Sequence, residues 1–430
     1  MGFFGRKRAP SVPHPRKEPR FDGPLTLKRL EQIFQDCVDF TKRPVSLGEG
    51  GACTLTLCYL SGMVKMERVS DYVLRPLAQD EALARCGTPR QAMEEMMGGA
   101  LYNLSAAERT TLDEAAFDLV AGWCLMFFPG ESAVLSLFVG TEEKRSISSP
   151  SNETVLKGSR DAFVESLRTN TSIVRRHLKT PELRIREQVV GRQSVTSVDI
   201  LYIEGLTNPH LVEQVAAQLA DIDIDAVLAT GNIEEYIVPA ARTAFPLVQY
   251  TERSDRFCAG LAEGRVGILI DGLPLGYLAP GVLGDFLQAP QDKSESWLLA
   301  SALTLLRYLC MLGTLLLPAL YVAMVTFHQE MIPTRLALSI IAAKQDVPFR
   351  SVFEVIVLLL AFEILQEAGL RLPQSIGQTV SIIGGLVVGS AAVEAKIISP
   401  AVLIVVAIAG IAGYTMPSQE VAGALRIWRF

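Results

Sequence analysis

The chain has 430 residues, of which 49% are apolar and 20% are charged, and its formal net charge is −6. This acidic balance, without a basic stripe that carries interleaved aromatic residues, argues against a nucleic-acid-binding function. The seven cysteines lack metal-ligand spacing and are expected to be reduced thiols. Most charges fall before about residue 295 and nearly all long apolar runs fall after it. The sequence therefore predicts a water-exposed region followed by a membrane region.

Residues 1–44 are expected to form a basic, proline-rich N-terminal segment that ends in a first helix. The opening GFFGRKR is basic, but several prolines follow it in place of the apolar core of a secretory signal. We therefore expect no signal peptide, and we expect the large N-terminal region to lie on the cytoplasmic side of the membrane.

An internal duplication organises the region that follows. YLSGM at Tyr59–Met63, with VSDYVLRPL after it, matches YIEGL at Tyr202–Leu206, with LVEQVAAQL after it. At nearly the same offset, GWCLMFFPG from Gly122 matches GRVGILIDG from Gly264, each an apolar strand and a tight turn. Both copies begin with alternating apolar and polar residues, the period of a half-buried strand. The repeat predicts two similar α/β subdomains, at residues 45–150 and 190–292.

Local signals refine these subdomains. Ser105 to Glu108 fits a capping box at the start of a helix. Residues 151–189 are expected to form a polar linker followed by a basic helix. Asp271-Gly272, between two strands, is interpreted as a hairpin turn and not as a catalytic pair. Because the sequence has no phosphate-binding glycine loop, nucleophile elbow or histidine cluster, we expect no enzyme activity, cofactor or metal site.

Residues 293–430 are expected to form an α-helical multipass membrane domain. A helix should start near Lys293, run along the interface through Trp297 and Arg307, and then cross the membrane at residues 308–327. Pro318 lies in the middle of this span, where proline frees a backbone carbonyl and bends the helix. It is either a packing kink or a gating hinge. Further crossings are expected at residues 351–370, 376–393 and 397–416.

The second of these helices carries an acidic stripe. Glu363 and Glu367 are four residues apart and share a face, and Glu354 falls on the same face. A carboxylate in the bilayer is costly unless it is paired or hydrated, so this face should contact protein or water. Three interpretations stay open: an ion pathway, interhelical pairing with groups such as Arg307, and an interfacial amphipathic helix.

Two apolar runs between Ser381 and Met416 flank a charged turn that contains Glu394 and Lys396. Such a pattern is typical of paired membrane helices. The first run is rich in glycine, serine and alanine, which let membrane helices approach closely. We therefore expect a tightly packed helical hairpin, with contacts inside one subunit or between subunits.

Several segments together carry a resemblance to a known family. They include the stretch SLRTNTSIVRRHLKTPELRIREQVVGRQSVTSVDILYIEGL, the shorter EGRVGILIDGLP, and the membrane segments LLPALYVAMVTFHQEMIPT, FEILQEAGLRLP and GQTVSIIGGLVVGSAAVEAKIISPAVLIVVAIAGIA. Over roughly residues 45 to 425 the chain resembles the A subunit of bacterial spore germination receptors, the GerA family.

The resemblance implies a multipass protein of the spore inner membrane. It implies a homo-oligomer that forms a nutrient-gated channel for monovalent cations, together with a permease-like B subunit and a lipoprotein C subunit. Alternatives are a non-conducting membrane scaffold and the paralogous branch that amplifies germination and is linked to dipicolinate release. A ring of Glu354, Glu363 and Glu367 around the oligomer is expected to line or gate the cation path.

The chain departs from the family pattern at two places. It ends at Phe430, where the resemblance leads us to expect a further hydrophobic helix and a tail, so two interpretations stay open, a truncated gene and a short variant. Lys396 stands where the family commonly has a small residue, and a local pair with Glu394 is one expectation.

Overall fold

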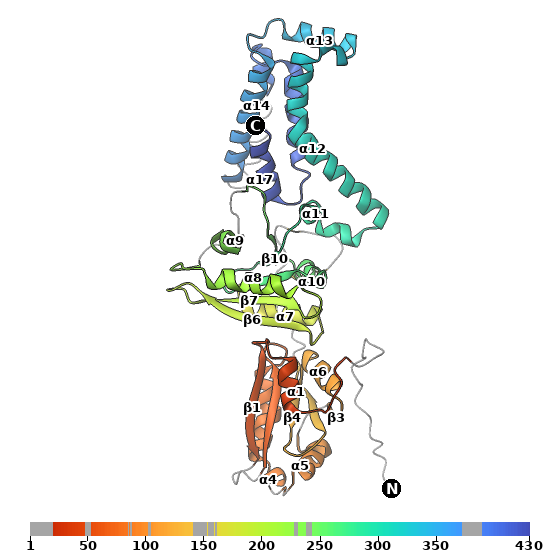
Figure 1. The fold of residues 1–430 in the computed structure, drawn as a ribbon, viewed down its shortest axis with the longest axis vertical. Coiled ribbons are helices and arrows are strands. Elements are labelled where there is room, and N and C mark those ends of the chain that lie inside the picture. The colour runs from red at the N-terminus through yellow and green to blue at the C-terminus, as the bar shows by residue number, and fades with distance from the viewer. Residues whose placement is uncertain are drawn as a thin grey trace. The chain divides into compact units, whose positions relative to one another are not determined.

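A computed structural model describes residues 20–47, 53–84, 86, 88–101, 105–140, 153, 159, 161–227, 231–237, 243–371 and 389–430. The chain forms two compact units. The first comprises Met1–Ala241 and Val248–Pro280, and the second comprises Arg242–Leu247 and Gly281–Phe430. Figure 1 labels several elements of each unit.

The first unit contains two five-stranded antiparallel sheets with the same strand order. The first sheet has the order β1-β2-β4-β5-β3. Its strands are β1 (Phe40–Leu47), β2 (Cys53–Leu60), β3 (Ala106–Arg109), β4 (Trp123–Phe127) and β5 (Val134–Phe138). The second sheet has the order β6-β7-β9-β10-β8. Its strands are β6 (Leu183–Val190), β7 (Thr196–Ile203), β8 (Gln249–Thr251), β9 (Val266–Ile270) and β10 (Gly276–Ala279). The predicted duplication is confirmed, because strands in equivalent positions of the chain occupy equivalent positions of the two sheets.

Helices cover both faces of each sheet. The first subdomain has α1 (Leu27–Ile33), α2 (Met66–Val69), α3 (Arg75–Gln79), α4 (Glu81–Ala84), α5 (Pro89–Glu95) and α6 (Leu112–Val120), with π-helical turns η1 (Ser70–Leu74) and η2 (Met96–Ala100). The second has α7 (Leu167–His177), α8 (Pro209–Ala220), α9 (Gly231–Ile237) and α10 (Ser254–Ala262).

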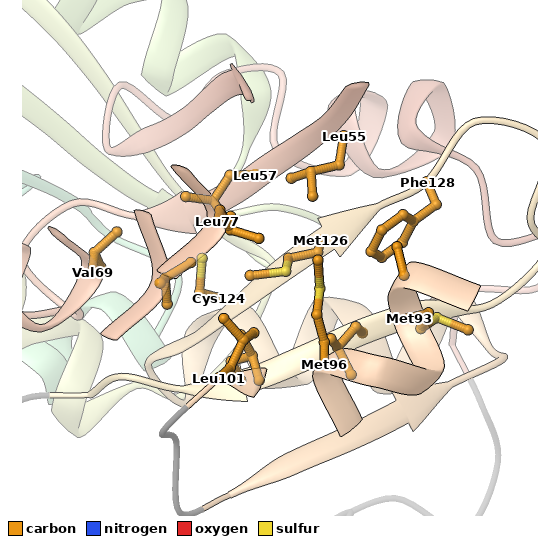
Figure 2. Packing of buried hydrophobic residues seen from close by; sticks show 14 of the residues in the cluster. Leu55, Leu57, Val69, Leu77, Met93, Met96, Leu101, Cys124, Met126 and Phe128 are labelled. Carbon is orange, nitrogen blue, oxygen red and sulfur yellow. The ribbon is translucent and has the colours of Figure 1, made fainter. Parts of the chain in front are cut away.

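The alternation of strand side chains separates two hydrophobic cores in each subdomain. On β4, Cys124 and Met126 pack with Leu77 of α3 and Met93 of α5, whereas Leu125 packs with α1 and α6 on the opposite face. Figure 2 shows the first of these two cores. The fully buried β4 therefore has a continuous apolar sequence, as predicted for a strand with both faces covered.

Two glycines repeat one close backbone approach in the two copies. Gly122 has φ +87° and Gly264 has φ +88°. A Cβ at Gly122 would lie 3.0 Å from the carbonyl oxygen of Met63, and one at Gly264 would lie 3.1 Å from that of Leu206. Both the left-handed conformation and the close contact require a residue without a Cβ.

Two local predictions have opposite outcomes. The capping box at Ser105 to Glu108 is wrong, because Ala106–Arg109 is strand β3 and pairs with β5. Helix α6 begins after it, with Thr111 as N-cap. The hairpin at Asp271-Gly272 is confirmed, since β9 and β10 flank it in antiparallel register. Asp271 Oδ1 also accepts a hydrogen bond of 3.1 Å from the first amide of α7, that of Leu167.

The subdomains extend beyond the ranges expected for them. The proposed boundary at residue 45 falls inside β1, and α1 packs with α6 on the first sheet. The basic helix expected within 151–189 is present as α7, and it belongs to the second subdomain together with β6, most of which lies in the same range. Residues 1–19 and most of the polar segment at 141–160 lie outside the described residues.

The second unit is helical. It contains α11 (Leu283–Leu287), η3 (Pro290–Ser294), α12 (Trp297–Phe327), η4 (Gln329–Met331), α13 (Thr334–Lys344), α14 (Ser351–Arg371), α16 (Pro400–Gly413) and α17 (Gln419–Trp428). Helices α12, α14 and α16 share a core that includes Tyr321, Leu358 and Val402. A smaller core joins α11 and α17 through residues such as Phe286 and Leu425.

Within the described residues, α12 is the one helix long and apolar enough to cross a membrane, by length and composition. It is a continuous helix from Trp297, so the span expected at 308–327 is its C-terminal part. Helix α16 is apolar but shorter. Most of the crossing expected at 376–393 lies outside the described residues. The multipass arrangement therefore stays a prediction.

Candidate functional site

Glu354 lies in the first turn of α14, on the face that packs against α12 and α16. Its neighbours Val355, Leu358 and Leu359 belong to the core shared by these helices, and Glu354 itself is only 1% exposed. Its Oε2 accepts a 2.8 Å hydrogen bond from the backbone N–H of Ser399, the N-cap of α16. The carboxylate thus satisfies an amide that the helix leaves unpaired, next to the positive end of the helix dipole.

The ammonium group of Lys344 forms an ion pair with Glu354. Lys344, at the end of α13, places its Nζ 3.6 Å from Glu354 Oε1. Lys344 Nζ also donates a hydrogen bond to Ser351 Oγ at the start of α14. A buried carboxylate is tolerated when a counter-charge and hydrogen bonds compensate its lost hydration. Lys344 and Ser399 supply both.

Glu363 has two arginine partners at the C-terminal end of α17, Arg426 within the helix and Arg429 as its C-cap. Arg426 Nη1 donates to Oε1 at 3.1 Å, and Arg429 Nη2 donates to Oε2 at 2.8 Å. The side chain of Arg429 is 1% exposed, and its guanidinium carbon lies 5.9 Å from the centre of the Phe362 ring. These contacts tie the amphipathic helix α17 to the middle of α14.

The structure separates the predicted acidic stripe into different surroundings. Glu354 is buried, Glu363 is half-buried, and Glu367 is exposed one turn further along α14. Arg307 contacts neither Glu354 nor Glu363. Its Nη2 donates to Asp292 Oδ1 at 2.9 Å and its Nη1 donates to the carbonyl of Leu287 at 3.2 Å.

The cations that do pair with the carboxylates, Lys344, Arg426 and Arg429, were not predicted. One signal was present for the arginines. They stand three apart and so share one face of an amphipathic helix. That spacing predicts a common target for the two side chains, but it does not identify Glu363.

Glu394 is the last helical residue before the turn that precedes α16, and Lys396 lies in that turn. Lys396 has φ +55° and pairs with Asp346, which lies in the connection between α13 and α14, instead of with Glu394. The charged turn is therefore linked to a second loop at the same end of the helices. This contact and the Glu354–Ser399 bond connect α16 to the α13–α14 region at two points.

Pro318 is buried inside α12. One turn earlier, at the position whose carbonyl the proline leaves without its helical partner, Thr314 Oγ1 donates a 3.1 Å hydrogen bond to the carbonyl of Ala409 in α16. The segment around Pro318 is thus tied to α16, and its role as a hinge stays a prediction.

A serine, a histidine and an aspartate meet in the first unit without the arrangement of a catalytic triad. Ser254 Oγ lies 3.1 Å from His177 Nε2, and Asp161 Oδ2 lies 3.7 Å from the same nitrogen. In a triad, the carboxylate binds the other ring nitrogen and orients the base. Among the described residues, no group of three or more histidine, cysteine, aspartate or glutamate side chains could hold a metal ion.

Comparison with known proteins identifies the family. The family model described as Bacillus/Clostridium GerA spore germination protein matches residues 28–430. Spore germination protein KA of Bacillus subtilis is 37% identical over 394 residues, which cover 91% of this chain and 71% of that protein. Spore germination protein GerLA of Bacillus cereus is 34% identical over 404 residues, which cover 94% and 81%.

Among solved structures, the N-terminal domain of the A subunit of the Bacillus megaterium spore germinant receptor GerK3 is 27% identical to this chain. The match has a TM-score of 0.48 and covers 60% of this chain and 94% of that one. With the family model matching residues 28–430, the chain belongs to the GerA family of spore germination proteins.

Proposed function

We propose that this chain is the A subunit of a spore germinant receptor and that it crosses the spore inner membrane several times, with its α/β unit in the cytoplasm. The family match over residues 28–430 and the long apolar helix α12 support this assignment. In this proposal the subunit forms a homo-oligomer and works with a permease-like B subunit, which senses the nutrient, and a lipoprotein C subunit.

The observation that carries the mechanism is the pairing of carboxylates on α14 with cationic side chains. Glu354 faces Lys344, and Glu363 faces Arg426 and Arg429, next to apolar helices. Rings of carboxylates favour cations in channels. We propose that α14 borders a path for monovalent cations in the oligomer and that these ion pairs keep the path closed. A carboxylate can face a passing cation only after its own partner has moved.

Ion flux into liposomes tests the proposal. The full-length protein, with its partner subunits, is reconstituted in vesicles with a potassium gradient, and nutrient is added. The expected result is a nutrient-dependent flux that is reduced in a variant carrying both Glu363→Gln and Glu367→Gln. Normal flux and normal germination in that variant would contradict the proposal that α14 borders the cation path.

A non-conducting scaffold is the second candidate, and the same ion pairs favour it. Glu363 has two arginine partners, and Glu354 caps α16, so both carboxylates can serve to hold helices together. A scaffold predicts no flux with or without the partner subunits. It also predicts that Glu363→Gln lowers the amount of assembled receptor in the membrane.

A further inference from the structure

Three buried oxygen atoms come together where α12, α14 and the start of α16 meet. They are Tyr321 Oη, Glu354 Oε1 and Ser399 Oγ, and none has a hydrogen-bond partner among the described residues. Tyr321 is 7% exposed, and the other two residues are each 1% exposed. The Tyr321 hydroxyl interacts with the Glu354 carboxylate and with the Ser399 hydroxyl, which lies near it without the distance and angle of a full hydrogen bond. Because buried polar atoms are nearly always hydrogen-bonded, a ligand between these three atoms would explain them.

The three atoms define the chemistry of that ligand. A carboxylate, a phenol and an aliphatic hydroxyl form an oxygen-only set, which suits hard cations. Glu354 Oε2 is already occupied by the amide of Ser399, so Oε1 is the oxygen left for a ligand. A water molecule also suits such a site, but it would bring no counter-charge to the buried carboxylate.

Lys344 shows that the space beside Glu354 Oε1 accommodates a positive charge. Its ammonium lies 3.6 Å from Glu354 Oε1, which is an ion pair beyond hydrogen-bonding distance. The pair is neutral, and a second cation beside it would leave an uncompensated positive charge in apolar surroundings. Lys344 and a free cation therefore exclude each other at Oε1.

We propose that Glu354, Tyr321 and Ser399 form a binding site for a dehydrated monovalent cation, and that Lys344 is a tethered competitor for it. When the Lys344 ammonium withdraws with the end of α13, sodium or potassium takes its place on Oε1. The choice of a monovalent cation as ligand rests on the proposed cation path. The site adds to that proposal one defined cation-binding position on the path, at the α13 end of the helices.

Cation-dependent thermal unfolding of the full-length protein in detergent tests the site. Sodium chloride and potassium chloride are compared with choline chloride at equal ionic strength. In Lys344→Gln, sodium or potassium should raise the Tm with a half-saturating concentration about tenfold or more below that of the unchanged chain, while choline has no effect. Adding Tyr321→Phe to Lys344→Gln should weaken this response.

The control is Arg335→Gln, which removes an exposed cation from the same helix and should leave the response of the unchanged chain as it was. If Lys344→Gln shows the same Tm in all three salts, the three oxygens hold water only and the proposal is wrong. If that variant does not fold, Tyr321→Phe alone gives the second measurement. It should reduce the rise in Tm at high sodium or potassium, and an unchanged rise overturns the site.

The failures of the two proposals are distinguishable. Cation-dependent stabilisation without flux in liposomes contradicts the channel and leaves the site intact. Flux without cation-dependent stabilisation contradicts the site and leaves the channel intact.

Discussion

Arg175 and Asp39 form a buried bidentate ion pair between the two α/β subdomains. Arg175 Nε lies 2.8 Å from Asp39 Oδ2 and Nη2 lies 2.9 Å from Oδ1, and the two side chains are 1% and 2% exposed. Beside the pair, the segment before β1 adds to the edge of β6, with a 3.0 Å hydrogen bond from Val38 N–H to the carbonyl of Ile185. Side-chain charge and backbone pairing thus fix the same junction.

Breaking this pair should destabilise the first unit strongly. Asp39→Asn leaves the Arg175 guanidinium buried without its counter-charge, and such a loss costs about 3–5 kcal/mol. Urea unfolding of the full-length protein in mild detergent measures the change. The control is Asp223→Asn, which breaks an ion pair with Arg192 in which both side chains are 67% exposed. That change should cost less than about 1 kcal/mol. Equal effects of the two changes would contradict a structural role for the buried pair.

The stability of the first unit should fall as pH rises toward neutrality because of Asp199. Burial on β7 raises the pKa of Asp199 to about 7, although Arg168 opposes this shift. The pKa of Asp199 in the folded chain lies above its unfolded value of about 3.9, so protonated Asp199 favours the folded state. This stabilisation is complete below about pH 3.9 and is lost as pH rises through about 7.

Asp199→Asn should therefore flatten the pH dependence and make the variant more stable than the unchanged chain at about pH 8. Thermal unfolding at about pH 5 and pH 8 measures the difference. Asp223→Asn, at an exposed carboxylate, should keep the original slope. If Asp199→Asn kept the pH dependence of the unchanged chain, a group other than Asp199 would cause that dependence.

The duplicated fold was predictable because its signals are local. The period of two in β2 and β7 and the turn glycines at positions 122 and 264 lie within short segments, and the second copy repeats them. The capping box failed for the opposite reason. Ser105 to Glu108 has the right local spacing, but pairing with β5, a segment far along the chain, makes it a strand.

The candidate site was predictable only in part. The spacing of Glu354 and Glu363 identified α14 as the acidic helix, because both lie on one apolar segment. Their partners depend on which helix ends meet after packing, and spacing does not contain that information. Arg307 illustrates the limit. One of the three interpretations paired it with the glutamates, but it binds Asp292, which is closer in the sequence.

Removing the charge of Glu363 should release α17. In Glu363→Gln, the Arg429 guanidinium stays buried and loses its counter-charge, at a cost of about 3–5 kcal/mol. Thermal unfolding and limited proteolysis between α16 and α17 measure the effect. Glu367→Gln changes an exposed residue one turn away and should cost less than about 1 kcal/mol.

A double variant separates charge from packing at the same place. Glu363→Leu combined with Arg429→Leu removes both charges of this pair and should recover most of the lost stability, as replacements of buried ion pairs by apolar residues often do. If the double variant is as unstable as Glu363→Gln, the two helices are held together by something other than this pair.

The turn glycines allow backbone strain and crowding to be measured apart. Gly264 and Gly272 have nearly the same φ, +88° and +83°, so an alanine at either position costs about 1–2 kcal/mol of left-handed strain. At Gly264 the new Cβ would also lie 3.1 Å from the Leu206 carbonyl oxygen, whereas at Gly272 no atom lies within 4 Å. Gly264→Ala should therefore lower the Tm more than Gly272→Ala. Because the fold is duplicated, Gly122→Ala should likewise lower the Tm more than Gly130→Ala, since no atom lies within 4 Å of a Cβ at Gly130. If the alanine at Gly272 or Gly130 lowered the Tm more than the alanine at Gly264 or Gly122 in the same copy, crowding by the carbonyl oxygen would not explain the cost.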